Sequence, residues 1–566
     1  MTRAAPYLLV VLLLVAIHTA LVFGGLSPIL KGELGDTDSY TRLLRVEVLV
    51  EDGAWFDSRL SQFNAPFGDT LNWTRPLDML ILAGALPLVT ELGYSWREAI
   101  YWSGALLPLI LHILVALALA WAAAPLLPVS ARPMVALLAA VTPIMLAYNL
   151  AGKPDQQTLL FLSLVMALGW VTRGLSNGDS PSRLGLYAGL WLGFGLWVTV
   201  EAQFAFAILL GVIGLVWLWR GEERALELGE CLALGFFVMV AVGLLVERGP
   251  LWPTLRELDK ISLLHALAAA VIAGCWGLMA AIARHGGRTK RYFTAAGGGA
   301  LALTALSFFT PELFLGPAGQ IEPRVYTEFF LKIREMRPLW PSDTESTGLL
   351  LLWLAQPLIA MPLWILRRPP SLQIWLPTLA LTVAFTLMAL LHARFAQVAA
   401  PLAAILLVYA AHELRLHASA LALLAPLFLG FGAVLLIPPD DSVRPTCDLG
   451  TIKAELAALP QGIVLAPLNY GPQLAYQTGH VVVGGPYHRN TAGILDTLDF
   501  FGDAPDSRAR EILTARGISY VLACPVGPEK VGLERQKALG SGQGPSWLEP
   551  LELPPGQDFR LYRVRG

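Results

Sequence analysis

The stretch Gly32–Arg45, GELGDTDSYTRLLR, comes directly after the first apolar run of the chain and carries two carboxylates, Asp36 and Asp38. The run before it, from Tyr7 to Gly25, is long enough to cross a bilayer. It exceeds the core of a usual signal peptide, and no clear Ala-x-Ala cleavage site follows it. We therefore expect a retained membrane span with two acidic side chains just beyond its outer end.

The composition of the whole chain is that of a polytopic membrane protein. Of its 566 residues 55% are hydrophobic and only 14% are charged, and the mean hydropathy is +0.59. An ordinary soluble enzyme is far less apolar. The formal net charge of -2 and the lack of a lysine- or arginine-rich run exclude a site for a phosphate backbone, so we expect no nucleic-acid partner.

Apolar runs of spanning length recur until about Ile437. We expect about thirteen transmembrane helices, near residues 7–25, 98–123, 133–150, 158–172, 184–200, 202–219, 226–246, 262–283, 292–315, 348–366, 372–391, 395–411 and 419–437. A further run, 76–93, is ambiguous because it is barely long enough and has Asp78 and Glu91 at its ends.

The basic residues of the short loops decide the orientation, since they favour the cytoplasmic side. If 76–93 does not cross, those residues all fall on the side of Arg3: Arg132, Arg173, Arg183, Arg220, Arg224, Arg284, Arg288, Lys290, Arg291, Arg367, Arg368 and Arg415. We therefore expect a cytoplasmic N-terminus. The run 76–93 becomes a re-entrant or interfacial segment of a long first external loop, 26–97.

This topology gathers the other polar residues at the external face. They are Asp36, Asp38, Asp155, His392 and Arg394, with the external loop 316–347. A single aspartate at a membrane surface is often a helix N-cap. Three of them from two separate loops favour a site for a hard cation, Mg²⁺ or Mn²⁺, because such ions prefer oxygen ligands.

After about Pro438 short apolar strands alternate with polar and Pro/Gly-rich segments. GIVLAP, HVVVGGP and SYVLACP are typical of strands, and TIKAELAAL and SRAREILTARG of amphipathic helices. The fold class we expect is a polytopic α-helical membrane protein, residues 1–437, with a small C-terminal α/β domain outside the cytoplasm, residues 438–566.

The C-terminal domain contains two cysteines, Cys447 and Cys524, while Cys231 and Cys275 lie in expected spans. A disulfide between the first two would suit an oxidising periplasm. The sequence leaves this pairing open.

Four separated segments resemble motifs of the oligosaccharyltransferase catalytic-subunit family, a branch of the GT-C membrane glycosyltransferases. GDTDSYTRLLR is similar to its first acidic motif and AGKPDQQT, Ala151–Thr158, to its second. KIREMRPLW, Lys332–Trp340, is similar to the family's Ser-x-x-Glu-x-x-Pro-x-x-Trp stretch, with Trp340 one position short. ARFAQVAAP, Ala393–Pro401, resembles an Arg-Phe segment followed by a proline at the head of a late span.

The resemblance implies a role for each matching residue. Asp38 would contact the metal and engage the acceptor nucleophile, with Asp36 as a neighbour, and Asp155 would be a second metal ligand. Arg394, with His392 beside it, would pair with the donor's lipid phosphate, and Glu335 would lie in a loop that closes over the acceptor. The alternatives are an arginine held by lipid headgroups and a plain surface glutamate.

Two departures from the family pattern concern the metal and the acceptor. Gln157 occupies the place of a metal-binding Glu or His, and an uncharged amide oxygen binds a hard cation more weakly. The signature Trp-Trp-Asp-Tyr-Gly becomes Pro467-Leu468-Asn469-Tyr470-Gly471, so recognition of an Asn-x-Ser/Thr sequon does not follow.

The acceptor could still contact two C-terminal turns. They supply Asn469, Tyr470, Tyr487, His488 and Arg489, the last three within GGPYHRN; a structured surface turn explains that segment equally well.

The expected function is inverting, metal-assisted transfer of a sugar or oligosaccharide from a polyprenyl-phosphate- or pyrophosphate-linked donor. The acceptor would be a protein, a lipid or a polysaccharide at the periplasmic face of a bacterial inner membrane. The absence of a glycine-rich nucleotide loop agrees with a lipid-linked donor. A transporter of lipid-linked glycans is an alternative, although the expected spans are nearly free of ionisable residues. An inactive relative that only binds prenyl lipids is another, because of Gln157.

Overall fold

The computed structural model describes residues 4–176, 180–367, 369–414, 416–437, 447–525 and 533–565. Arg3, Arg368 and Arg415, which contributed to the expected orientation, lie outside the described residues, as does the expected domain boundary at 438.

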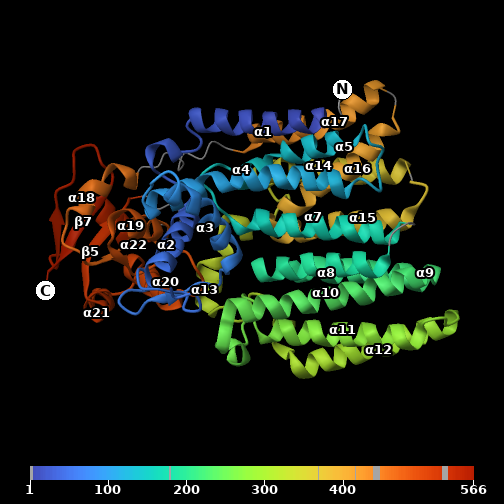
Figure 1. Cartoon of the computed structure of the whole chain (residues 1–566). Coiled ribbons are helices and arrows are strands. Elements are labelled where there is room, and N and C mark those ends of the chain that lie inside the picture. The colour runs from blue at the N-terminus through green and yellow to red at the C-terminus, as the bar shows by residue number, and fades with distance from the viewer. Residues whose placement is uncertain are drawn as a thin grey trace.

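Long helices lie side by side through most of the molecule, and the C-terminal domain packs at one end of them (Figure 1). The long helices are α1 (Ala5–Phe23), α4 (Trp96–Ala122), α7 (Gln156–Leu175), α8 (Pro181–Val198), α9 (Ala202–Arg220), α10 (Glu223–Arg248), α11 (Leu263–Ala283), α12 (Arg288–Phe309), α14 (Thr344–Arg367), α15 (Leu372–Leu391), α16 (Ala396–His412) and α17 (Leu416–Gly432). The N-terminus lies at the end of the bundle away from the C-terminal domain (Figure 1).

Eleven helices in the described part of the chain are long and apolar enough to cross a membrane, compared with about thirteen expected. The run 133–150 forms two short helices, α5 (Arg132–Ala140) and α6 (Pro143–Tyr148). Pro143 explains the break, because a proline has no N–H to continue the preceding helix and restricts the residue before it. The run 184–200 is helix α8, in which Arg183 and several glycines lower the hydropathy.

The glycines of α8 allow it to pack closely against α10. A Cβ added at Gly189 would overlap the carbonyl oxygen of Leu232, and one at Gly185 would overlap that of Leu228. Small residues four positions apart commonly bring the backbones of membrane helices together. Helix α8 therefore lies largely among other helices, which explains how it can be less apolar than its neighbours.

The external segments lie at the end of the bundle next to the C-terminal domain (Figure 1). Between α1 and α4 they form η1 (Ile29–Lys31), α2 (Thr37–Asp52), β1 (Arg59–Leu60), β2 (Asp69–Thr70) and α3 (Arg75–Thr90). Between α12 and α14 they form η3 (Pro311–Leu315), α13 (Pro323–Glu328), η4 (Phe330–Lys332) and η5 (Arg334–Met336). Helix α3, the ambiguous run of the sequence, has 16 residues and is not among the eleven candidate spans.

The C-terminal domain is a five-stranded mixed sheet with helices, as its alternating pattern predicted. The strand order is β4-β3-β5-β7-β6, with β3 parallel to β4 and β5, and β7 antiparallel to β5 and β6. The strands are β3 (Ile463–Leu465), β4 (Val481–Val482), β5 (Ile518–Ala523), β6 (Leu548–Leu551) and β7 (Arg560–Val564), and the helices are α18 (Lys453–Ala457), α19 (Gly471–Thr478), α20 (Thr491–Phe501), α21 (Asp506–Arg516) and α22 (Glu534–Gly540). The sequence pattern had indicated β3, β4, β5, α18 and α21.

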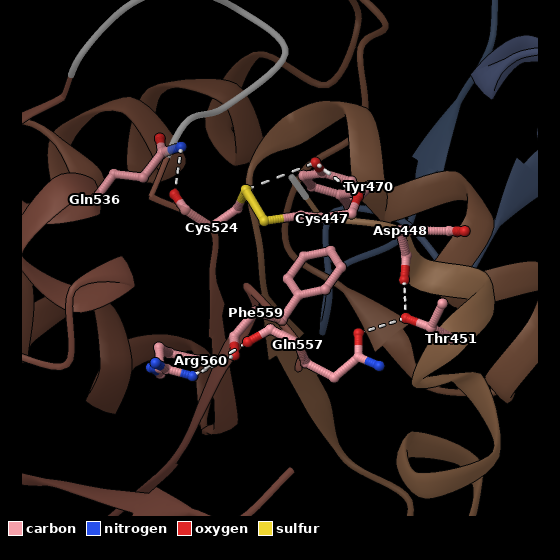
Figure 2. The surroundings of a disulfide bond; sticks show 9 residues. All are labelled: Cys447, Asp448, Thr451, Tyr470, Cys524, Gln536, Gln557, Phe559 and Arg560. Carbon is pink, nitrogen blue, oxygen red and sulfur yellow. Dashed lines mark hydrogen bonds between the residues drawn. A yellow bond between two sulfur atoms is a disulfide. The ribbon is translucent and has the colours of Figure 1, made fainter. Parts of the chain in front are cut away.

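A disulfide bond joins Cys447 to Cys524, which answers the question that the sequence left open (Figure 2). It links the first described residue of the domain to the residue after β5. Tyr470 lies beside it, with its hydroxyl donating to the carbonyl oxygen of Cys447 at 3.4 Å and its ring against Phe559. The disulfide therefore ties the start of the domain to the middle of its sheet.

The first external loop is attached to the edge of this sheet. The N–H of Val482 in β4 donates to the carbonyl of Gln62 at 2.8 Å, and the N–H of Ala65 donates to the carbonyl of Val482 at 3.1 Å. Arg516 donates to the carbonyl of Ala65 at 2.8 Å. The C-terminal domain thus helps to hold the loop that carries helix α2.

Candidate active site

Helix α2 begins at the acidic pair. Asp36 is its N-cap, and its Oδ1 accepts hydrogen bonds from the backbone N–H of Ser39 at 3.0 Å and from the Ser39 hydroxyl at 2.5 Å. Asp38 lies in the first turn, where the helix dipole favours negative charge. The N-cap alternative is therefore correct for Asp36, and Asp38 is left with an accessible carboxylate.

Helix α7 begins in the same way at Asp155. Its Oδ1 accepts from the backbone N–H of Gln157 at 2.9 Å. The loop before it runs beside the first acidic loop, since the N–H of Gly35 donates to the carbonyl of Gly152 at 3.0 Å. Two helix starts that are far apart in the sequence are thus held together by one backbone hydrogen bond.

The carboxylates influence one another electrostatically. Desolvation by the surrounding protein, together with Asp36, Glu335 and Asp155, raises the pKa of Asp38 well above its ordinary value, although the side chain remains reachable by solvent. Burial and the nearby Glu335 raise the pKa of Asp155 to about 6. Four acidic side chains therefore share one site, and we name this set, Asp36, Asp38, Asp155 and Glu335, the acidic cluster.

Glu335 reaches the cluster from the loop between α12 and α14. Its Oε2 accepts from the hydroxyl of Tyr148, at the end of α6, at 2.9 Å. The same loop is fixed to the head of α16, because Nδ1 of His392 lies 2.9 Å from the carbonyl oxygen of Met336 and the N–H of Ala393 donates to the carbonyl of Arg337. His392 thus contacts the protein backbone here.

Arg394 precedes α16 and is paired with Glu201 at 3.1 Å. Glu201 also accepts from the Gln157 amide at 3.3 Å, and Gln397 donates to the Gln157 carbonyl at 2.7 Å. Sequence reasoning missed Glu201, although it is the charged residue of the short external turn between two expected spans. The amide of Gln157 is thus engaged with two protein partners.

Of the residues expected to contact the acceptor, Tyr487 lies nearest the acidic cluster. Its hydroxyl donates to Oγ1 of Thr41 at 2.6 Å, and its ring packs edge-on against Trp73. Burial and the neighbouring Asp38 raise the pKa of Tyr487 well above its ordinary value. Tyr487 therefore forms part of the wall beside Asp38.

The other four residues of that set contact the protein itself. Nε2 of His488 lies 2.7 Å from Asp259, and Arg489 binds the same carboxylate at 2.8 Å. The carbonyl of Asn469 accepts from Oγ1 of Thr37 at 3.3 Å, and Tyr470 lies at the disulfide (Figure 2). In this structure Asn469, His488 and Arg489 attach the C-terminal domain to other loops. Tyr470 packs inside the domain.

Helix α2 is held from behind by a buried ion cluster that sequence reasoning missed. Asp78 of α3 is completely buried and pairs with Arg42 at 3.0 Å and with Arg45 and Arg75 at 3.2 Å each. Burial disfavours the charged carboxylate, yet the three arginines together lower the pKa of Asp78. The ion cluster fixes α2 against α3 and so positions Asp38.

The acidic cluster has the oxygen donors that a hard cation prefers, but it is not a closed cage. Among the described residues, no three His, Cys, Asp or Glu side chains lie close enough to hold a metal ion. Mg²⁺ is commonly held by one or two carboxylates and completed by water and substrate phosphate. Asp38 and Asp155 are the two carboxylates we would expect in such a site, and the amide of Gln157 is hydrogen-bonded to Glu201 and Gln397.

No protein-family description and no curated protein matches the chain. Among solved structures, the chain resembles the Archaeoglobus fulgidus oligosaccharyltransferase in its apo form, with 16% identity, a TM-score of 0.64, and coverage of 92% of this chain and 69% of that one. The complex of that enzyme with an inhibitory peptide and a dolichol-phosphate gives 15% identity, a TM-score of 0.64, and coverage of 99% and 74%. The complex of the enzyme with Zn and sulfate gives 15% identity, a TM-score of 0.61, and coverage of 94% of this chain and 70% of that one.

These similarities extend over nearly the whole chain and show its fold. The chain has the fold of the archaeal oligosaccharyltransferase, a polytopic helical bundle with a C-terminal domain. The resemblance that four short motifs predicted is confirmed at the level of the fold.

Proposed function

We propose that the chain is a membrane glycosyltransferase that uses a polyprenyl-phosphate- or pyrophosphate-linked donor at the periplasmic face of a bacterial inner membrane. The observation that carries this proposal is the meeting of the acidic cluster and Arg394 from separate segments at one end of a GT-C fold. Carboxylates and an arginine at the membrane surface suit transfer from a lipid phosphate, since they can activate an acceptor and bind a leaving phosphate.

An apolar cavity in the helical bundle supports a lipid-linked donor. It has a volume of about 610 Å³ and lies among α9, α10, α11 and α12. Phe204 lines it and also contacts Phe395, the neighbour of Arg394, with 6.0 Å between the ring centroids. We propose that an isoprenoid chain bound here extends toward the segment that carries Arg394. The related archaeal enzyme has been solved with a dolichol-phosphate.

The reaction would be a single displacement with inversion. Asp38 would orient the acceptor nucleophile and take its proton as the new bond to the anomeric carbon forms. The bond from that carbon to the phosphate oxygen breaks, and the phosphate leaves with the electron pair. Arg394 would bind the leaving phosphate through paired N–H groups, which match phosphate geometry, and Glu201 would orient Arg394. A Mg²⁺ or Mn²⁺ ion bound by Asp38 and Asp155 would supply further positive charge.

The acceptor we favour is a lipid or polysaccharide, or an unusual protein site. The turn that replaces the family's sequon-reading signature has neither tryptophan nor aspartate. Its Asn469 carbonyl and Tyr470 hydroxyl bond within the protein. Nothing in this turn therefore supports recognition of an Asn-x-Ser/Thr sequon.

A strain of the source organism that lacks the chain tests the proposed function. We expect one surface glycan, on lipid, polysaccharide or protein, to disappear while its prenyl-linked precursor accumulates, as measured by mass spectrometry. Complementation with the unaltered chain should restore it. Unchanged glycans in all three classes, with no accumulated precursor, would contradict the proposal.

Removal of divalent ions with a chelator tests separately whether the transfer reaction requires a metal ion. With purified protein, a prenyl-linked donor and its acceptor, EDTA should lower the transfer rate by about a hundredfold or more, because the leaving phosphate loses a source of charge stabilisation. Mg²⁺ or Mn²⁺ in excess over the chelator should restore the rate. An enzyme that keeps its full rate in EDTA would show that the carboxylates work without an ion.

A further inference from the structure

Lys153 is a residue of the second acidic motif that the proposed reaction leaves unexplained. It lies two positions before Asp155 in AGKPDQQT. Its ammonium pairs with Oδ2 of Asp36 at 3.2 Å and therefore bridges the two helix starts that carry the acidic cluster. The same ammonium interacts electrostatically with Asp155 and Glu335.

The path of the Lys153 side chain is built into the neighbouring loop. A Cβ at Gly35 would lie 2.6 Å from Cγ of Lys153, so the glycine in GDTD leaves room for the lysine stem. Beyond the stem, Nζ lies 3.4 Å from the carbonyl oxygen of Ala147 and 5.8 Å from the ring centroid of Tyr148. A carbonyl and an aromatic face are both favourable neighbours for a cation.

The charges around the cluster show what this lysine contributes. Arg394 is paired with Glu201, and Arg42 with Asp78. In the part of the chain that the structure describes, Lys153 is the one cation within ion-pair distance of any of the four carboxylates. It therefore supplies positive charge in direct contact with the cluster, whereas Arg42 and Arg394 act on the carboxylates from a greater distance.

We propose that Lys153 is the resident cation of the acidic cluster and that it keeps the affinity of the donor-free site for divalent ions low. The lysine ammonium and a divalent metal ion are both positively charged, so they repel each other when they are only a few ångströms apart. The repulsion is strong where water is partly excluded. The benefit of a low affinity rests on the proposed function. The affinity for the metal ion would rise once the lipid phosphate of the donor adds its oxygen ligands, so the ion and the donor would bind together.

Mn²⁺ binding to the full-length, donor-free protein in detergent tests this inference. Binding is measured by electron paramagnetic resonance and by the shift in unfolding temperature that Mn²⁺ causes. We expect Lys153→Met and Lys153→Gln to bind Mn²⁺ at least about tenfold more tightly than the unaltered chain, because they remove one nearby positive charge. Lys153→Arg should bind as weakly as the unaltered chain. Lys31→Met, at an exposed lysine of the loop that carries Asp36, is the matched control.

A second substitution locates the effect at the acidic cluster. Adding Asp36→Asn to Lys153→Met removes the carboxylate that the lysine had held, so most of the gain in Mn²⁺ affinity should disappear. If the neutral variants fold only when Mn²⁺ is present, the ion replaces the lysine charge, which supports the proposal. Neutral variants that bind Mn²⁺ no better than the unaltered chain, or that unfold without rescue by Mn²⁺, would overturn it. No donor or acceptor is used, so this result is independent of transferase activity.

Discussion

Asp38→Asn is expected to lower the rate of glycosyl transfer by about a thousandfold, while the protein still inserts and folds. The substitution keeps the shape of the side chain but removes the charge that would take the acceptor proton. Asp38 suits this role because its carboxylate is accessible, and because desolvation and the neighbouring carboxylates raise its pKa, which makes it a stronger base than an ordinary aspartate. Transfer is measured with the purified protein, a prenyl-linked donor and the acceptor found in the deletion strain.

Asp52→Asn is the matched control for this experiment. Asp52 is the last residue of the same helix, and its side chain is exposed. The control should transfer sugar at the unaltered rate, and both variants should unfold at the same temperature as the unaltered chain. An Asp38→Asn protein that keeps its rate would remove Asp38 from the reaction.

Asp78→Asn is expected to lower the free energy of unfolding by about 3–5 kcal/mol, which is the usual cost of breaking a buried ion pair from one side. Asp78 is completely buried, and its loss would leave Arg42, Arg45 and Arg75 without their shared anion. The exposed Asp57→Asn in the same external loop should change stability little. Thermal unfolding in detergent, followed by tryptophan fluorescence, measures both.

The pH dependence of this effect has a definite sign. The arginines lower the pKa of Asp78 in the folded protein, so its contribution to stability is fully present above the ordinary aspartate pKa of about 4 and is lost as the pH falls through the lowered value. The difference in the free energy of unfolding between the unaltered chain and Asp78→Asn should therefore stay constant from pH 5 to pH 7. An Asp78→Asn variant as stable as the unaltered chain would show that the arginines find other partners.

Hydropathy predicted most of the helical bundle, and the change of pattern after it predicted the small sheet near the C-terminus. The differences lie at two runs, 133–150, which a proline breaks, and 184–200, a helix less apolar than a lipid-facing span. Each difference has a local cause, Pro143 in the first run and Arg183 with several glycines in the second, that a search for apolar runs alone does not consider. The alternation of strands and helices likewise predicted the C-terminal domain but missed β6 and β7, in which charged residues or a proline interrupt the apolar residues.

The candidate site was only partly predictable. Spacing and topology assigned Asp36, Asp38, Asp155, Glu335 and Arg394 to one face of the membrane, and the structure places them in one region. Their partners were not predictable. Glu201, which pairs with Arg394, lies outside the four motifs, and Lys153, which pairs with Asp36, lies within the second acidic motif but had no stated role. Their parts in the site depend on which loops lie next to each other.

Residue order alone determined which segments are apolar enough to cross a membrane and which are not, because hydropathy acts on each segment separately. Only the packed molecule decides that Cys447 bonds to Cys524, that His488 and Arg489 bind Asp259, and that Gly35 makes room for Lys153. Each of these contacts joins residues far apart in the chain, and its formation depends on the relative position of whole helices and loops.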